Sequence, residues 1–445
     1  MGLSRPVTRT NDGPGFAARA AATALLSAVL DRHQPLDAVI EGDRAFAGLD
    51  ARDRALARAI VGMTLRRHGT VEAALSALMD KRPRAAGNLI RVLEIAAAQI
   101  LFMGVADHAT VSVAVDQLAA DHNARHFKGL ANAVLRRMVR ERAAIMAKID
   151  TPEADTPPWL WQRWSAAYGE ATVRGIAAAH RLEPSLDLSV KSDAAGWAEK
   201  LGGIVLPNGS VRLLASGDVA ALPGYAEGAW WVQDAAAALP AMPAGNVAGK
   251  RVADLCAAPG GKTAALAAAG ATVTAVDISA PRVQRLTANL KRLGLSAETV
   301  AADVLKWEPA DPFDIVLLDA PCTATGTIRR HPDVALLKVP GDVATLARVQ
   351  ARMIDRAVAM LKPGGTLIYC TCSLEPEEGE GQLGPALARL PLTLMPVEPA
   401  EIGGLAEVVT AGGTVRSLPT HLTHPNPRLS GLDGFFVMRL RKATG

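Results

Sequence analysis

The sequence predicts three domains in a row: an all-α helical bundle, a small α+β region, and a Rossmann-like α/β domain built on a parallel sheet. Residues 15–149 carry apolar residues at helical spacing throughout, and residues 246–445 alternate strand-like with helix-like segments. Residues 150–158, rich in Pro and Thr, have the composition of a linker, and residues 159–245 form the small region. A chain of 445 residues has the length of two or three domains.

The N-terminal segment and the hydropathy pattern give the first expectations. We expect residues 1–14, rich in Arg, Pro, Thr, Asn and Gly, to be a disordered lead. The apolar run at 20–30 mimics a secretion signal, but Arg19, Asp31 and the lack of a small-residue cleavage site favour an ordinary helix. No stretch approaches 18 consecutive apolar residues, so we expect no transmembrane helix and no membrane partner.

The bundle is expected to contain six or seven short helices. Asp50 is a plausible N-cap for a helix over 52–67, and further helices are predicted over 108–120 and 127–149. The positive charge of the chain also lies here. Residues 1–150 carry 21 Lys and Arg against 15 Asp and Glu, whereas the remainder carries 27 against 29. This excess is compatible with a polyanionic partner.

One predicted helix gathers several of these basic side chains. Lys128, Arg136, Arg137 and Arg140 all belong to the helix over 127–149, where they could follow a phosphate backbone. A solvated basic face on an amphipathic helix explains the same pattern equally well. Charge alone therefore leaves RNA binding by Lys128, Arg136 and Arg137 as one of two interpretations.

The small region mixes short helices and strands. Three tryptophans open a helix at 159–164, strands are expected over 186–191 and 211–214, and a helix over 193–201 lies between them. These elements are too few for a doubly wound sheet of their own. We therefore expect an α+β subdomain that packs on the last domain.

A Gly-rich turn between a buried strand and a helix opens the last domain. Gly260 and Gly261 let the backbone turn sharply and approach a ligand without side-chain obstruction. The helix that begins near Lys262 directs its free N–H groups and its positive dipole end toward that ligand. Neither the P-loop pattern nor the Gly-x-Gly-x-x-Gly fingerprint is present. The turn therefore predicts a nucleotide-type site of another kind.

The strands that follow place carboxylates beside this turn. Strands are expected over 251–256, 272–277, 299–302, 313–319, 365–371 and 435–440. Asp277, Asp303 and Asp319 close three of them, at the carboxyl ends where open α/β sheets bind ligands. Asp277 could accept hydrogen bonds from ribose hydroxyls and Asp303 from an adenine amino group, whereas Asp319 is expected nearest the reaction centre. The pattern predicts an adenosine-type ligand, with S-adenosylmethionine as the best candidate.

Two cysteine motifs follow neighbouring strands of the predicted sheet. They are Asp319-Ala-Pro-Cys322 and Thr371-Cys372-Ser373, so Cys322 and Cys372 can converge on one pocket. A thiolate that adds to C6 of cytosine makes C5 able to accept a methyl group from a sulfonium. One cysteine is needed for this attack, and a second can help to release the product.

Cysteines also bind metals, form disulfides or lie inert in a protein core. The Cys370-x-Cys372 pair could be half of a zinc site, but no second pair and no histidine at ligand spacing completes it, so we expect no metal. Cys256 and Cys370 are expected to be buried and inert. All four cysteines lie in the second half of the chain, which favours reduced thiols and a cytoplasmic setting over a disulfide framework.

Taken together, these motifs resemble those of the RNA cytosine-C5 methyltransferases of the NOL1/NOP2/Sun family. The matching segments are 254–263, 319–322, 371–373, 230–234, 326–333 and 433–436. The helical N-terminal domain resembles NusB, an RNA-binding antitermination factor. Its pairing with such a catalytic domain resembles the bacterial 16S ribosomal RNA methyltransferases of the RsmB type. The resemblance covers nearly the whole chain and implies a class I methyltransferase fold.

The resemblance also implies a role for each matched position. Cys372 would be the nucleophile, Cys322 would assist product release, and Asp319 would hydrogen-bond the target base. DNA cytosine methyltransferases use the cysteine of their Pro-Cys motif instead, so the chemistry alone leaves the choice of nucleophile open. S-adenosylmethionine would be bound by Cys256, Ala257, Ala258, Pro259, Gly260, Gly261, Lys262, Asp277, Arg282, Asp303 and Asp319. RNA would be contacted by Arg329, Arg330 and His331.

The chemistry also limits the substrate, because the target cytosine must be unpaired or must leave its stack. We expect the partner to be RNA, most directly 16S rRNA, and the enzyme to be a monomer. Two alternatives stay open: the same chemistry on tRNA or 23S rRNA, and a non-catalytic RNA-binding or antitermination factor with a vestigial α/β domain. The intact pair of cysteines argues against the second.

Overall fold

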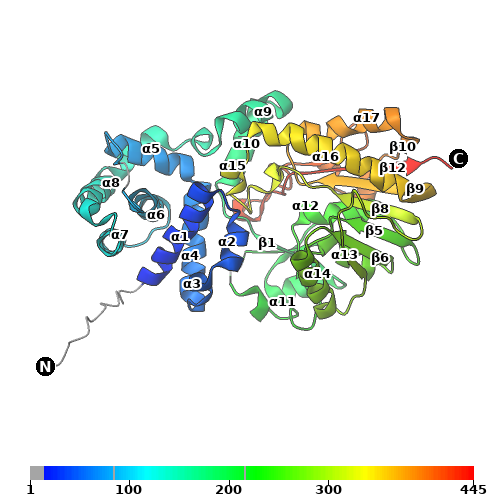
Figure 1. The fold of residues 1–445 in the computed structure, drawn as a ribbon, viewed down its shortest axis with the longest axis horizontal. Helices are drawn as coiled ribbons and strands as arrows, with labels where there is room; N and C mark the ends of the chain where they lie inside the picture. The colour runs from blue at the N-terminus through cyan, green and yellow to red at the C-terminus, as the bar shows by residue number, and fades with distance from the viewer. Residues whose placement is uncertain (1–14, 84–85, 215–216, 445) are drawn as a thin grey trace. The chain divides into compact units, whose positions relative to one another are not determined.

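A computed structural model describes residues 15–83, 86–214 and 217–444, and the chain forms two compact units (Figure 1). The first unit runs to Trp161 and includes the segment His331–Leu337, and the second consists of Gln162–Arg330 and Lys338–Gly445. The expected disordered lead lies outside the described residues. Among the helices that are described, none is both long and apolar enough to cross a membrane.

The first unit is helical, as the sequence predicts. Its helices are α1 (Phe16–Arg32), α2 (Leu36–Gly42), α3 (Arg44–Ala47), α4 (Ala51–Arg66), α5 (His68–Leu78), α6 (Leu89–Phe102), α7 (Asp107–Ala120), α8 (Lys128–Ile149) and the short α15 (Val334–Leu337), with 3-10 turns η1 (Arg125–Phe127) and η2 (Pro152–Asp155). Helix α6 is buried along ten of its fourteen residues, because its sequence is apolar on nearly every side. Asp50 caps α4 by accepting from the Asp53 N–H, as expected.

The segment 150–158 packs more tightly than its composition indicates. Asp155 accepts a hydrogen bond from the Thr70 N–H at 2.8 Å and lies 2.9 Å from Arg67, with only 3% of its side chain exposed. These contacts hold η2 against α5. The segment 150–158 is therefore a connection that packs against the helical bundle and not a flexible linker.

The small α+β region follows, and the boundary between the two units falls within its first helix. Its elements are α9 (Pro158–Tyr168), α10 (Glu170–His180), β1 (Leu186–Val190), α11 (Ala194–Leu201), β2 (Ile204–Val205), β3 (Val211–Leu213), η3 (Val219–Ala221) and β4 (Trp230–Val232). The strands form an antiparallel sheet in the order β2-β3-β1-β4. Leu188, Val211 and Trp230 are buried on one face of it. The expected α+β character is confirmed.

The main sheet has the order β10-β12-β9-β8-β5-β6-β7, and β11 pairs with β12. Its strands are β5 (Arg251–Leu255), β6 (Thr272–Asp277), β7 (Glu298–Ala301), β8 (Phe313–Asp319), β9 (Leu361–Thr371), β10 (Leu392–Leu394), β11 (Val415–Ser417) and β12 (Phe435–Lys442). The five strands from β9 to β7 are parallel, and β12 runs antiparallel to β9. The six predicted strands are confirmed, whereas β10 and β11, three residues each, carry no strand signal in the sequence.

Helices cover both faces of this sheet (Figure 1). One face holds α12 (Ala235–Ala238), η4 (Leu239–Ala244), α13 (Gly261–Ala268) and α14 (Ala280–Arg292), and the other holds α16 (Pro340–Ala359) and α17 (Glu380–Arg389). Further 3-10 turns are η5 (Thr325–Thr327), η6 (Pro376–Glu378), η7 (Pro399–Ile402), η8 (Ala406–Val408) and η9 (Pro427–Leu429). Because both faces are buried, the parallel strands read as apolar runs. The chain passes outward from β5 to β7 and returns to β8, so the strand order reverses beside β5, where such folds bind ligands.

Candidate active site

The Gly-rich turn leaves its backbone bare at the start of α13. Cys256 leaves β5 in a left-handed conformation with φ of 61°, and Gly260 adopts φ of 103° directly before the helix. A Cβ on Gly260 would lie 2.8 Å from the Leu286 Cγ atom, so a larger residue is excluded by space as well as by conformation. The free N–H groups at the start of α13 can therefore face a ligand.

Asp277 ties this turn to the end of β6. One carboxylate oxygen accepts from the Ala258 N–H at 3.2 Å and the other from the Ser279 N–H at 3.0 Å. Arg282 lies 3.3 Å from the same carboxylate. Asp277 is only 1% exposed, so its first role in the fold is to order the turn. The ribose contact expected of it stays a prediction.

Asp254 lies in β5 directly beneath the turn. Its Oδ2 accepts the Thr263 hydroxyl, whereas Oδ1 is buried and has no hydrogen-bond partner. Burial raises the pKa of Asp254 to about 7. A buried acceptor without a partner, below a bare helix start, suits a ligand that brings a cationic amino group as well as a nucleoside.

Asp303 and Asp319 bring two more carboxylates to the same edge of the sheet. Asp303 caps the turn after β7 by accepting from the Leu305 N–H at 3.0 Å, and a third of its side chain stays exposed. Asp319 ends β8, lies 2.8 Å from the Lys262 Nζ and is 29% exposed. Burial disfavours the charge on Lys262, but the neighbouring Asp319 outweighs this effect and raises the pKa of Lys262. The Lys262 ammonium thus forms an ion pair with Asp319.

The two motif cysteines meet because of the pairing between β8 and β9. Asp319 pairs with Cys370 in this parallel register, so the residues that follow each strand become neighbours. The sulfurs of Cys322 and Cys372 lie 3.4 Å apart. The hydrogen bond with Cys372 and the burial of the site raise the pKa of Cys322 well above its usual value. Either sulfur can donate the hydrogen bond between them, and the raised pKa favours the thiol form of Cys322.

The other two cysteines occupy different surroundings. Cys370 is wholly buried in β9, where burial and the Asp319 charge raise its pKa. Burial and the charges of Asp319 and Asp277 also raise the pKa of Cys256. Cys370 is buried as expected, whereas Cys256 lies just after β5 and keeps part of its surface exposed. The raised pKa of each thiol disfavours the thiolate that attack requires.

Arg329 and Arg330 are not placed as an RNA surface would require. Arg329 is 3% exposed, and its guanidinium lies 3.2 Å from Asp433 and 3.5 Å from Asp234. Arg330 pairs with Asp234 and lies 3.4 Å from Asp187. Burial opposes ionisation of Asp234, but the two arginines hold its pKa well below the usual range. These guanidinium groups fix the loop after Cys322 from within, so we withdraw them from the predicted RNA contacts.

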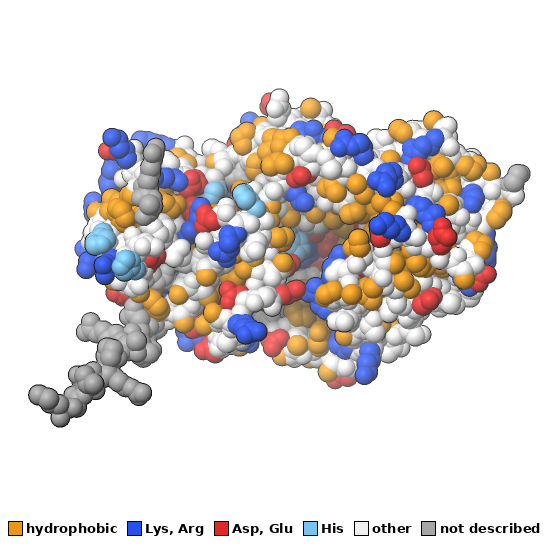
Figure 2. Space-filling view, in the orientation of Figure 1, with side chains coloured by type: hydrophobic (Ala, Val, Ile, Leu, Met, Phe, Trp, Pro, Cys, Tyr) orange, Lys and Arg blue, Asp and Glu red, His pale blue; other side chains and the backbone are white. Residues whose placement is uncertain are grey.

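His331 and the basic residues of α8 belong to the first unit. His331 is exposed and lies 3.3 Å from Asp37. Lys128, Arg136 and Arg137 are also exposed, although Arg137 pairs with Glu141 at 2.9 Å. Basic and histidine side chains gather over α7 and α8 (Figure 2). A groove of 570 Å³ lies between these helices, and its lining includes Asp107, His108, Asn132, Arg136 and Arg140.

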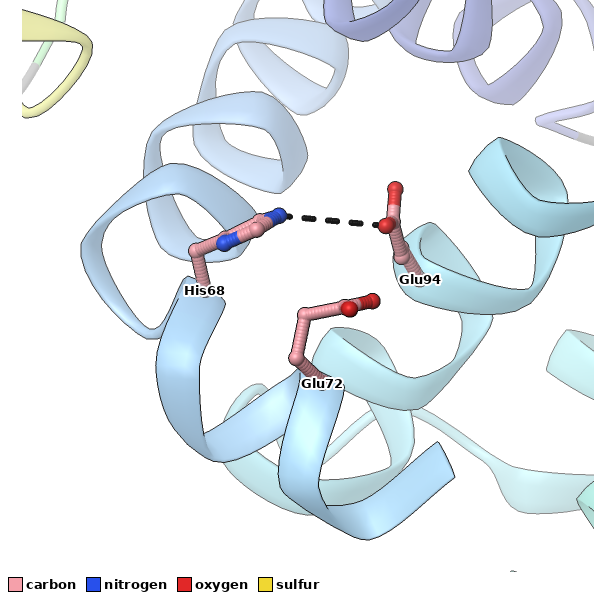
Figure 3. Close-up of side chains that lie close together, drawn as sticks. All are labelled: His68, Glu72 and Glu94. Atoms are coloured by element: carbon pink, nitrogen blue, oxygen red, sulfur yellow. Dashed lines mark ion pairs between the residues drawn. The ribbon is translucent and has the colours of Figure 1, made fainter. Parts of the chain in front are cut away.

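A second group of titratable side chains lies within the first unit. A ring nitrogen of His68 and a carboxylate oxygen from each of Glu72 and Glu94, on α5 and α6, lie within 4.8 Å of one another (Figure 3). Arg91 donates to both carboxylate oxygens of Glu94, and Arg82 donates to both oxygens of Glu72. Burial raises the pKa of Glu94 to about 8. Because arginines occupy the oxygens that a cation would need, we interpret this group as a structural charge cluster.

Sequence reasoning missed the polar groups that support the cysteines. Glu378 is wholly buried and accepts hydrogen bonds from both cysteine loops. Asp234 and Asp433 belong to the segments 230–234 and 433–436 that carry the family resemblance, yet nothing in their spacing indicates that they meet Arg329. The sequence shows only that each aspartate belongs to a motif, and this does not reveal which residue it pairs with.

Both units match known protein families. Residues 245–441 match the family model of 16S rRNA methyltransferase RsmB/F, and residues 17–140 match that of the NusB family. The crystal structure of PH0851 shares the fold, with a TM-score of 0.75 and 22% identity over 99% of this chain and 100% of that chain. A methyltransferase homolog protein from Pyrococcus horikoshii gives a TM-score of 0.51 and 26% identity over 63% of this chain and 93% of that chain.

Two curated relatives carry the name ribosomal RNA small subunit methyltransferase B. The protein from Klebsiella pneumoniae is 37% identical over 358 residues, which cover 76% of this chain and 83% of the relative. The protein from Vibrio cholerae is 34% identical over 404 residues, which cover 86% and 92%. Identity at this level over most of both chains shows that this chain belongs to the RsmB/F family of 16S rRNA methyltransferases.

Proposed function

We propose that this chain methylates C5 of a cytosine in 16S rRNA with Cys372 as the nucleophile and Cys322 as the residue that assists release. The activity and its methyl donor, S-adenosylmethionine, follow from membership in the family. The observation that supports the residue roles is the 3.4 Å contact between the two sulfurs at the carboxyl end of the sheet. The raised pKa of Cys322 favours its thiol form, which supports Cys372 as the sulfur that attacks.

The residues at the Gly-rich turn fit S-adenosylmethionine. The bare N–H groups after Gly260 suit a polar ligand, and Asp254 offers a buried acceptor without a partner. Asp303 and Asp319 keep exposed carboxylate surface for further contacts. When bound, S-adenosylmethionine supplies a methyl group on a positively charged sulfur. Cys256 to Lys262, Asp277, Arg282, Asp303 and Asp319 would hold it.

The side chains of the chain then have defined tasks. The Cys372 thiolate adds to C6 of cytosine, and the electron pair of the C5–C6 double bond becomes available at C5. Asp319, at the end of the neighbouring strand, would hydrogen-bond the cytosine. After C5 is methylated, a water molecule accepts the C5 proton, the freed C–H electron pair re-forms the C5–C6 double bond, and the C6–S bond breaks with its electrons going to the Cys372 sulfur. The Cys322 thiol, 3.4 Å away, stabilises the departing Cys372 sulfur by donating a hydrogen bond.

The proposal also covers the residues that contact RNA, the domain bounds and the compartment in which the protein acts. The cytosine is unpaired or flipped out of its stack when Cys372 attacks. Lys128, Arg136 and Arg137 on α8 are the exposed basic residues that we assign to RNA phosphates, with His331 as a further contact. The proposed domains are the helical bundle at 15–149, the small α+β region at 159–245 and the methyltransferase domain at 246–445. The four free cysteines support a reducing cytoplasm.

Removal of the Asp277 carboxylate is expected to weaken S-adenosylmethionine binding. The Asp277→Ala variant loses a charged acceptor for ribose and the anchor of the Ala258 backbone. A hydrogen bond to a charged group contributes about 1.5–3 kcal/mol, so the dissociation constant should rise roughly 10- to 100-fold. Titration calorimetry measures it. Asp311→Ala, which removes an exposed carboxylate of the same unit, is the matched control. An unchanged affinity in Asp277→Ala would exclude the ribose role.

Bisulfite mapping of total RNA tests the target. Cells that carry the gene should protect a cytosine of 16S rRNA from conversion, and cells that lack it should not. Protection confined to tRNA or 23S rRNA would contradict the target but keep the chemistry. If no cytosine anywhere depends on the gene, the non-catalytic alternative is correct.

A further inference from the structure

Glu378 is a buried carboxylate that contacts both cysteine loops. It lies in η6, has no exposed surface, and belongs to neither cysteine motif. Its Oε1 accepts from the Thr323 N–H at 3.0 Å. Its Oε2 accepts the hydroxyls of Thr323 and Ser373.

The positions of these partners give the contacts their meaning. Thr323 directly follows Cys322, and Ser373 directly follows Cys372. Both are wholly buried, and their hydroxyl oxygens lie 3.1 Å apart. A single carboxylate therefore bridges the two backbone segments from which the catalytic sulfurs project.

Glu378 is itself held from several sides. Gln350 of α16 donates to its Oε1 at 3.0 Å and also to the Pro321 carbonyl at 2.9 Å, one residue before Cys322. The Glu378 carbonyl accepts from the Tyr369 hydroxyl at 2.7 Å and from the Thr371 hydroxyl at 3.2 Å. Glu378 is thus fixed to α16 through its side chain and to β9 through its backbone carbonyl. A rigid support of this kind can set a distance.

We propose that Glu378 is a positioning residue that sets the separation of the Cys322 and Cys372 sulfurs; this inference rests on the proposed roles of the two cysteines. An ionised carboxylate is an acceptor at every lone pair, so it can serve the Thr323 amide, both hydroxyls and Gln350 together. A glutamine of the same shape cannot, because its amide nitrogen only donates. The bridge therefore requires the acid.

The charge has a second effect on the pair. The hydrogen bond with Cys372 and burial contribute most to the raised pKa of Cys322, and the negative charge of Glu378 raises it further. Burial raises the pKa of Glu378 itself, and the hydrogen bonds from Ser373 and Thr323 oppose that shift. The same group thus fixes where the Cys322 thiol lies and helps it to keep its proton.

The test measures the sulfur pair directly in the full-length protein. Diamide, a thiol oxidant that accepts two electrons and two protons, closes a disulfide between thiols that are in contact, and mass spectrometry follows the Cys322–Cys372 product. In Glu378→Gln we expect closure to slow about tenfold, because the sulfurs no longer share a fixed separation. We also expect kcat for methylation to fall on the order of 100-fold, with KM for RNA and affinity for S-adenosylmethionine retained.

Matched variants separate positioning from general damage. Glu377→Gln changes the adjacent residue, which is half exposed and pairs with Arg163 at 2.7 Å, and should leave both rates unchanged. Glu378→Asp keeps the charge and should recover part of both rates. Thr323→Val removes one hydroxyl from the bridge and keeps the Thr323 amide donor, so it serves if Glu378→Gln does not fold. Thermal unfolding monitors the fold in each case.

The outcomes are distinct. Closure as fast in Glu378→Gln, or in Thr323→Val as its substitute, as in the unaltered chain overturns the proposal, even if kcat falls. Slower closure with an unaltered melting temperature supports it. Closure needs neither RNA nor methyl donor, so a chain that fails to methylate 16S rRNA would refute the proposed function while leaving this result intact.

Discussion

Replacement of Cys372 by serine is expected to abolish methyl transfer to 16S rRNA. A serine hydroxyl stays protonated at neutral pH and is a far weaker nucleophile toward C6 than a thiolate. Loss of a nucleophile typically lowers kcat by a factor on the order of 10⁴ to 10⁶. Transfer of a radioactive methyl group from S-adenosylmethionine to 16S rRNA measures the effect.

The neighbouring thiol provides the control for Cys372→Ser. Cys370 lies two residues earlier, within β9, is wholly buried, and is not proposed to react. Cys370→Ala should retain methyl transfer. Normal turnover by Cys372→Ser would refute the assignment. If Cys322→Ser then lost all activity and formed no adduct, the Pro-Cys cysteine would be the nucleophile.

Replacement of Cys322 by alanine is expected to trap the enzyme on its RNA. The variant keeps the Cys372 nucleophile but lacks the thiol that contacts the departing sulfur at 3.4 Å. Attack at C6 then proceeds, whereas expulsion of Cys372 becomes slow. A denaturing gel should show a slowly migrating protein–RNA band that contains a large share of the protein, and turnover should stop after about one cycle.

The double variant shows which sulfur forms the bond. Cys322→Ala combined with Cys372→Ser should give no adduct, because the attacking thiolate is gone. An adduct that persists in the double variant would place the covalent bond elsewhere. The absence of any adduct in Cys322→Ala, with normal turnover, would remove Cys322 from the release step.

Much of the site could be predicted because its parts are local in sequence. The Gly-rich turn combines a strand, two adjacent glycines and a helix within a dozen residues, and each has a conformational reason. Strand-end carboxylates could be placed because parallel strands expose their carboxyl ends at one edge. The contact between Cys322 and Cys372 follows from the pairing of β8 with β9, once those two strands are known to be neighbours.

The contacts of buried charges could not be predicted in the same way. An arginine beside a catalytic motif has the same sequence signature whether it binds a phosphate or an aspartate. Arg329 meets Asp433 across more than a hundred residues of chain, and only the folded sheet brings them together. Glu378 was missed because it lies in a short turn that carries no periodicity. The strands β10 and β11 could not be predicted for the same reason, because three residues are too few to show an alternating pattern.

The position of β12 affects how the enzyme is made on the ribosome. In the described sheet β12 separates β9 from β10, and it is the last strand to be synthesised. Until then β9, whose end leads to Cys372, presents an open edge of unpaired backbone groups that is prone to mispairing. The nascent chain therefore carries the two proposed catalytic thiols before β12 covers this edge, and rapid pairing of β12 with β9 protects the edge from mispairing.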